Sequence, residues 1–270
     1  TILIYPEQGL GDAIQFVRVA SALKRRGASV RLQCSARMLP LFTSAPGIDQ
    51  LVLDTAIPSA IDYHASMIDA LDVLYHETGQ IEWGTELFRC DTANVATGYL
   101  TVSDALIAYW KRWLDQNTTG KRVGINWQGN PDHHADLYRS VPLELLRPLS
   151  TIRGIELVNL QFGYGSEQLD RCDFIDRIVR LPDHVDTDGG AFTDTTAILR
   201  NLECVVTSDT AIAHLAGAVG TPVIMMLGRV PDWRWLLEGT TTPWYPTMTL
   251  VRQQTLGCWD DVIANVCELL

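Results

Sequence analysis

Hydrophobic residues near the start of the chain follow the spacing of a strand and then that of a helix. Ile2–Tyr5 is a short apolar run, which predicts a strand. Across Asp12–Arg26 apolar residues recur every three or four positions, which predicts one amphipathic helix that ends at Gly27. The loop between these two elements carries Gly9 and Gly11, and Asp12 stands at the predicted helix start.

The same alternation of apolar runs and amphipathic segments continues along the chain. Further strands are expected around Val30–Cys34, Gln50–Asp54, Val123–Trp127, Leu157–Phe162, Ile178–Leu181, Cys204–Thr207 and Val223–Leu227. Helices are expected at Val102–Leu114, from Pro142 to Leu149, and at Thr195–Leu202, Thr210–Val219 and Asp260–Leu269. The stretch from Asp62 to Tyr99 has no periodicity that assigns it.

This alternation of strands and helices predicts an α/β fold with parallel sheets and right-handed crossovers. The polar segment DQNTTGKR interrupts the rhythm, which then restarts, and we interpret that segment as a linker. We therefore expect two Rossmann-like domains that face each other across a cleft, residues 1–118 and 119–270.

Composition narrows the classes of function. The 270 residues carry a net charge of −11, which argues against a nucleic-acid-binding protein, because such proteins show a basic surface. An anionic ligand stays possible, since a local site can be positive on an acidic protein.

None of the six cysteines forms a C-x-x-C pair, so free thiols and a cytoplasmic location are expected. No apolar run approaches the roughly 18 residues of a membrane span. Because Thr1 directly precedes a strand, we expect the chain to be trimmed from a longer protein.

The segment VVTSDTAIAHLAGAVGTP places a strand directly before a helix. The first amides of that helix, from Thr210 onward, have no intrahelical partner and suit an anion. His214 follows Thr210 by one helical turn, so both side chains are expected near that end. The structural alternative is an ordinary helix with Asp209 as its cap and His214 as a satisfied polar residue.

Three other segments carry candidate chemistry. In NWQGNPDHHADLYRS, Arg139 is suited to hold a phosphate, while adjacent histidines in a polar loop are a poor metal cluster. DTDGG resembles a cation-binding pair, but a solvated turn explains it better. The aromatic rings of DWRWLLEGTTTPWYPTM are expected to fix a long loop, with a nucleotide-lining ring as the alternative.

The motifs QGLGDAIQF, NWQGNP…YRSVPL, SDTAIAHLAGAVGTP, DWRWLLEG…PWYPTMTLVRQ and CWDDV occur in an order that resembles bacterial ADP-heptose:lipopolysaccharide heptosyltransferases, glycosyltransferase family 9. The chain looks most similar to the branch fused behind tetratricopeptide repeats, some members of which modify flagellin or other proteins. The resemblance implies a GT-B fold with the donor nucleotide on the second domain and the acceptor mainly on the first. It also implies a terminal helix (about 258–270) that crosses back to the first domain, and inverting catalysis without a metal or other cofactor.

Carried onto this sequence, the resemblance assigns roles to individual residues. Asp12 matches the proposed catalytic base, although a residue that merely favours the helix start is the structural alternative. The predicted donor-binding residues are Arg139, Asp209, Thr210, Ala211, His214, Gln128 and Asn130. The predicted acceptor-side residues are Gly9, Gly11 and His64, and His64 or Asp62 is the alternative base.

The implied partners are a nucleotide-sugar donor, a glycan or protein acceptor, and a tetratricopeptide-repeat region outside this chain. Two other function classes stay open at this point. One is a GT-B-fold nucleotide-sugar epimerase or hydrolase, which would turn over donor without an acceptor. The other is a non-catalytic module that binds glycan or protein.

Overall fold

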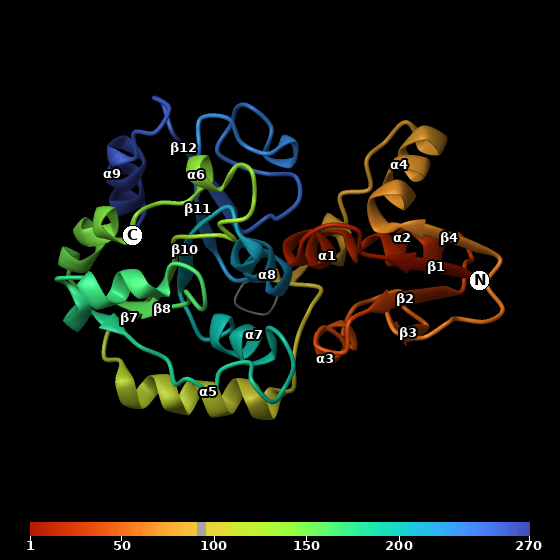
Figure 1. The fold of residues 1–270 in the computed structure, drawn as a ribbon, viewed down its shortest axis with the longest axis horizontal. Coiled ribbons are helices and arrows are strands. Elements are labelled where there is room, and N and C mark those ends of the chain that lie inside the picture. Colours follow the sequence, from red (N-terminus) through yellow and green to blue (C-terminus); the bar gives the residue numbers. More distant parts are fainter. Residues whose placement is uncertain (91–95) are drawn as a thin grey trace.

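The computed structural model describes residues 1–90 and 96–270 and contains two parallel sheets in separate lobes (Figure 1). The first sheet has the order β3-β2-β1-β4. Its strands are β1 (Ile2–Tyr5), β2 (Val30–Cys34), β3 (Gln50–Leu53) and β4 (Tyr63–Ser66), and its helices are α1 (Leu10–Phe16), α2 (Val19–Arg25), α3 (Leu39–Phe42) and α4 (Met67–Thr78). We call these elements the first lobe.

The second sheet has the order β12-β11-β10-β7-β8-β9 and is parallel throughout. Its strands are β7 (Lys121–Asn126), β8 (Ile155–Asn159), β9 (Ile178–Val179), β10 (Cys204–Ser208), β11 (Val223–Leu227) and β12 (Met248–Arg252). Its helices are α6 (Asp136–Arg139), α7 (Thr193–Leu199), α8 (Ala211–Val219) and α9 (Asp260–Leu269), with the short 3₁₀ turns η2 (Leu143–Thr151), η3 (Ser166–Arg171), η4 (Ile175–Arg177) and η5 (Trp233–Trp235). With α5, described below, they form the second lobe.

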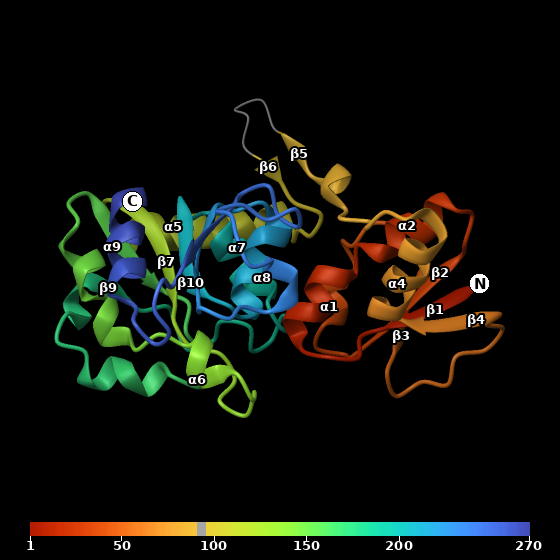
Figure 2. The ribbon, with the colours of Figure 1, turned by 90° about the horizontal axis from the view of Figure 1, so that it is seen from above.

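Between the lobes the chain forms η1 (Thr85–Leu87) and the short pair β5 (Arg89–Cys90) and β6 (Ala96–Thr97), and it then enters the second lobe at α5 (Asp104–Asn117). Figure 2 shows β5 and β6 projecting beside the junction of the lobes. The unassigned stretch thus supplies β4 and α4 of the first lobe and the crossing to the second. Its residues 91–95 lie outside the described part of the chain.

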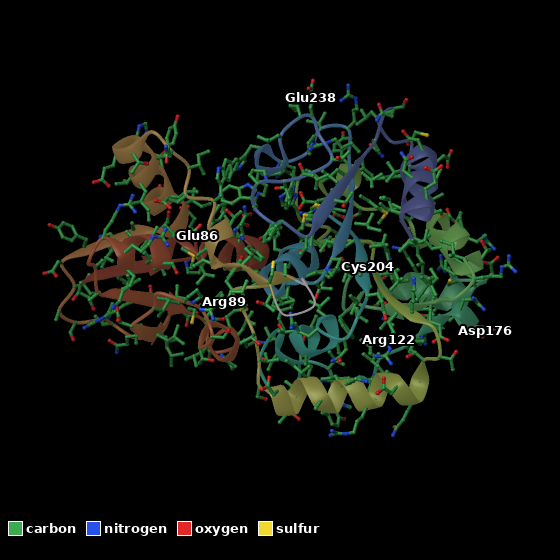
Figure 3. All side chains as sticks on the ribbon, turned by 180° about the vertical axis from the view of Figure 1, so that it is seen from behind. Glu86, Arg89, Arg122, Asp176, Cys204 and Glu238 are labelled. Atoms are coloured by element: carbon green, nitrogen blue, oxygen red, sulfur yellow. The ribbon has the colours of Figure 1, made fainter. Side chains whose placement is uncertain are left out.

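The α/β fold with two parallel sheets is as expected, but α5 lies elsewhere than the sequence boundary placed it. It packs on α7, and the buried Trp110 donates its indole N–H to Asp194 over 2.8 Å. At its end, Asp115 pairs with Arg122 of β7, which Figure 3 shows above this helix. The segment expected as the linker is therefore a turn inside the second lobe, and the crossing lies ahead of Ser103.

The terminal helix also differs from expectation. We expected it to cross back to the first lobe, but α9 packs on β11, β12 and η2 of the second (Figure 1). The reason is its apolar face, since Val262, Ile263 and Val266 complete the buried core on that side of the sheet. The crossing element is therefore the segment before α5.

The helix expected over Asp12–Arg26 is two helices, α1 and α2. Arg18 stands at the break and donates its Nε to the carbonyl of Gln15, which competes with the helical hydrogen bond there. The turn η2 is 3₁₀ rather than α-helical, and Pro148 inside it cannot donate a backbone hydrogen bond. None of the helices in the described ranges is both long and apolar enough to span a membrane.

Candidate active site

A cavity of about 1440 Å³ lies between the lobes. In the second sheet the strand order reverses between β7 and β10, and ligands of such sheets bind beyond the carboxyl ends of the strands at that point. Gln128 follows β7 and Asp209 follows β10, and both line the cavity. The first lobe contributes Gly9 of the loop after β1, and Gly11 and Asp12 of the first turn of α1. The cavity therefore occupies the position expected for a ligand site.

The start of α8 forms one wall. Thr210 is the N-cap residue, and it lines the cavity with Ala211 and Ile212. Its hydroxyl donates to Oδ1 of the buried Asn126 over 2.7 Å, so this side chain is held by β7 and does not cap its own helix. The first amides of the helix have no intrahelical partner and can serve an anion in the cavity.

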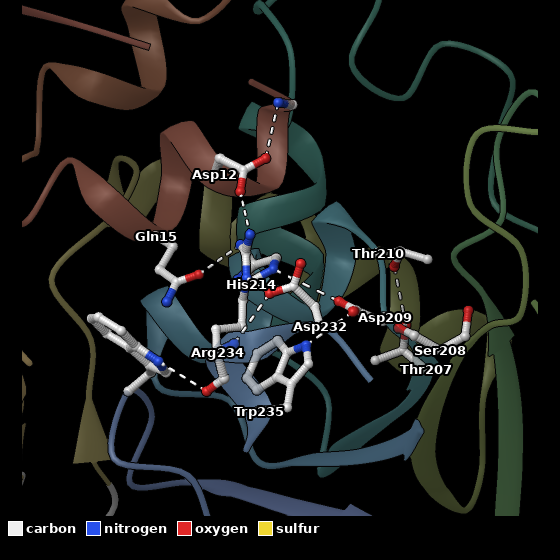
Figure 4. Close-up of polar contacts among 12 residues, drawn as sticks. Asp12, Gln15, Thr207, Ser208, Asp209, Thr210, His214, Asp232, Arg234 and Trp235 are labelled. Atoms are coloured by element: carbon white, nitrogen blue, oxygen red, sulfur yellow. Dashed lines mark hydrogen bonds and ion pairs between the residues drawn. The ribbon is translucent and has the colours of Figure 1, made fainter. Parts of the chain in front are cut away.

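His214 lies buried one turn into α8, with Nδ1 3.0 Å from the Tyr245 hydroxyl. Its Nε2 lies 3.9 Å from Asp209 Oδ1 (Figure 4). Burial, reinforced by nearby guanidinium groups, lowers the pKa of His214 well below its usual value, so the ring is neutral. Burial raises the pKa of Asp209, which accepts the Trp235 indole N–H over 2.9 Å. A neutral imidazole adds no charge to the site but offers a ring N–H for hydrogen bonding.

Arg139 enters the cavity from α6. Asp136 holds it through Nε at 3.3 Å, and the guanidinium lies against Gly129, where a Cβ would come within 2.5 Å of Arg139 Nη2. Gln128 and Asn130 also line the cavity, but their side chains have protein partners. Gln128 accepts from Gln168, and Asn130 accepts the amide of Asp132. All the predicted donor-side residues therefore meet at this one cavity.

The contacts of Asp12 fit both the prediction of a catalytic base and the alternative of a residue that favours the helix start. Its Oδ2 accepts the Gly9 amide over 2.9 Å, the reach-back contact of a helix start. Its Oδ1 lies 2.7 Å from Nη2 of Arg234, and the residue lines the cavity (Figure 4). The carboxylate thus supports the start of α1 and also lines the cavity.

Sequence reasoning missed Arg234. It lines the cavity, is 6% exposed, and contacts Asp12, Gln15 and Asp232. The signal was present in the motif DWRW, where a single arginine stands among apolar rings.

The remaining candidates either lie outside the cavity or have a structural role beside it. His64 is exposed on the outer strand β4, outside the cavity, and Asp62 pairs with the terminal amine, so neither is placed to act as the acceptor-side base. In DTDGG, Asp186 does line the cavity, but its carboxylate accepts the amides of Asp194 and Thr195 at the start of α7, a capping role. The rings of Trp233, Trp235, Trp244 and Tyr245 lie outside the cavity lining, and Trp233 stacks on Phe16 of the first lobe.

Comparison with known proteins agrees with this geometry. Residues 191–264 match glycosyltransferase family 9 (heptosyltransferase). Protein FlbA of Caulobacter vibrioides is 26% identical over 290 residues, and the chain spans 46% of the length of that relative.

Solved structures show the same fold. ADP-heptose LPS heptosyltransferase II of E. coli has a TM-score of 0.63 at 14% identity, covering 100% of this chain and 98% of that one. E. coli heptosyltransferase WaaC with ADP-2-deoxy-2-fluoro heptose has a TM-score of 0.56 at 12% identity, covering 99% of both chains. Residues 191–264 therefore resemble glycosyltransferase family 9, and the chain as a whole has the GT-B fold of these heptosyltransferases.

Proposed function

We propose that this chain moves a sugar from a nucleotide-sugar donor to a hydroxyl of a glycan or protein acceptor, with inversion and without a bound metal. The observation that carries the proposal is the meeting of Asp12, from the first lobe, with the start of α8, from the second, at one cavity. The donor diphosphate would bind at the amides of Ala211 and Ile212 with Arg139 beside them.

In the reaction, the acceptor hydroxyl gives its proton to the Asp12 carboxylate while its oxygen bonds to the anomeric carbon. The bond from that carbon to the diphosphate oxygen breaks, and the nucleotide leaves with the electron pair. The helix start and Arg139 stabilise the charge that develops on the leaving phosphate. Because the base on the first lobe and the leaving group on the second lie across the cavity, the acceptor oxygen would attack the anomeric carbon on the face opposite the departing diphosphate, which inverts its configuration.

The test is Asp12→Asn, which keeps the size of the side chain but cannot take the proton. A screen of nucleoside diphosphates and CMP by thermal shift first identifies the donor class. The variant should fold, bind that nucleotide as the parent does, and transfer sugar roughly 10²-fold or more slowly. If Asp12 only supports the helix start, transfer stays near the parental rate, because Asn serves there almost as well.

Asp69 supplies the matched control. It occupies the corresponding position in the first turn of α4, is exposed, and lies outside the cavity. Asp69→Asn therefore measures what the loss of a first-turn carboxylate does by itself, and it should leave transfer unchanged. The acceptor, the cytoplasmic location and the tetratricopeptide-repeat partner stay predictions from sequence.

A further inference from the structure

Arg234 crosses from the second lobe to the first and contacts two residues of α1. Its Nη2 lies 2.7 Å from Asp12 Oδ1, and its Nη1 donates to Gln15 Oε1 over 2.9 Å. Its Nε donates to Asp232 Oδ1 over 2.8 Å within its own loop. Figure 4 shows the guanidinium between these partners. Each of the three guanidinium nitrogens of Arg234 therefore has a different partner, in a different direction.

The surroundings make this arrangement rigid. The guanidinium lies 5.5 Å from the ring centroid of Phe16 and 5.7 Å from that of Trp233. The side chain is 7% exposed, and the Asp12 side chain is 18% exposed. Charges removed from water in this way need paired partners, so the ion pair between the lobes is kept together by the cost of leaving either charge alone.

The two oxygens of Asp12 are held from different sides. Oδ1 meets Arg234 of the second lobe, and Oδ2 accepts the Gly9 amide of its own loop. Two contacts on different oxygens fix the plane of the carboxylate. Oδ1 is shielded from solvent, so Oδ2, which keeps a second lone pair beside its bond to the Gly9 amide, would take the proton from an acceptor hydroxyl.

We propose that Arg234 is the positioning residue of Asp12, so that the base is aligned only when the lobes are in contact as they are here. This inference rests on the proposed function of Asp12. Gln15 completes the arrangement by holding the second edge of the guanidinium. A lysine cannot replace this fork, because a single ammonium does not reach Asp12, Gln15 and Asp232 in fixed directions.

The experiment measures turnover and nucleotide affinity for Arg234→Gln, Arg234→Lys, Asp12→Asn and the double variant Asp12→Asn/Arg234→Gln. Arg234→Gln should lower kcat roughly 10- to 100-fold, the effect of a misplaced catalytic group, while the Kd of the nucleotide changes less than about twofold. Arg234→Lys should restore only part of kcat. In the Asp12→Asn background, Arg234→Gln should cause no further loss, because the group it positions is gone.

Arg252 is the control for damage to the loop. It donates to the carbonyls of Leu236 and Gly239 in the same segment but does not line the cavity. Arg252→Gln should leave kcat near parental at a temperature where the variant is folded. If Arg234→Gln fails to fold, Gln15→Met removes one arm of the arrangement without removing a charge, and it should lower kcat with nucleotide Kd unchanged.

Three results would overturn the inference. A fall in nucleotide affinity that matches the fall in turnover would place Arg234 in the donor site. Independent, multiplicative losses in the double variant would show that Arg234 acts without Asp12. Parental turnover in Arg234→Gln would show that Asp12 needs no such support. Parental transfer in Asp12→Asn is a different result, which would remove the proposed function of Asp12 itself.

Discussion

Gly11 of the first lobe lies directly against His214 of the second. A Cβ at position 11 would stand 2.7 Å from Cδ2 of His214 and 3.5 Å from the Cα of Ala211. Since α1 packs on α8, this glycine lets the first turn of α1, which carries Asp12, approach the proposed anion site (Figure 2). The contact explains the glycine by space, with no need for an unusual backbone conformation.

Gly11→Ala should therefore separate α1 from the start of α8. Both neighbours are backbone or a buried ring, so the added methyl has nowhere to go, and a loss of about 1–3 kcal/mol in stability is expected. Urea denaturation measures that loss, and nucleotide Kd should rise in parallel. Gly189→Ala is the control, because its Cβ would meet only Thr193, at an ordinary 3.6 Å. Equal free energies of unfolding for the two variants would show that α1 and α8 can move apart to admit the methyl group without loss of stability.

Arg139→Ala tests the donor side. Removal of a charge-assisted contact to the diphosphate should weaken nucleotide binding by about 1.5–3 kcal/mol, measured by calorimetry. The matched control is Arg147→Ala, which removes an exposed arginine that pairs with Asp173 outside the cavity. An unchanged nucleotide Kd in Arg139→Ala would take this residue out of the donor site.

Local signals in the sequence were sufficient for the α/β class and for much of the site. The glycine loop before Asp12 and the strand-to-helix junction at Thr210 are each readable within a few residues. They meet because both follow the carboxyl ends of central parallel strands. The strand β12 was missed, since no helix separates it from the aromatic loop before it.

The remaining features depend on distant partners. Arg234 and Gln15 are 219 positions apart, so no local pattern joins them. The lobe to which α5 belongs is decided by Asp194, which lies 84 positions from Trp110. The helix pattern of α5 was read correctly, but a pattern shows only that a face is buried and does not identify what buries it.

Trp110→Ala tests the placement of α5. The indole is buried where α5 packs on α7, so its removal should leave a cavity and an unpaired oxygen on Asp194, with a loss of about 3–5 kcal/mol. Tyr109→Ala, on the exposed side of the same helix, should lose far less. Thermal or urea unfolding followed by circular dichroism compares them, and equal losses would contradict this packing.

His214 gives the protein a pH-dependent stability whose sign can be stated. Its pKa is lowered in the folded state from the usual 6.5, first by burial, so below pH 6.5 the unfolded chain binds a proton that the folded chain does not. Stability should therefore fall as pH decreases from 6.5, by at most about 1.4 kcal/mol per pH unit for this one group.

Unfolding free energies measured in urea from pH 7.5 to 5.5 give the slope of stability against pH. His214→Asn should flatten it, whatever its stability at neutral pH. Tyr245→Phe removes the hydroxyl beside Nδ1 but leaves the histidine buried, so its slope should persist. Parallel slopes for His214→Asn and the parent would show that the imidazole takes up its proton equally in the folded and unfolded chains.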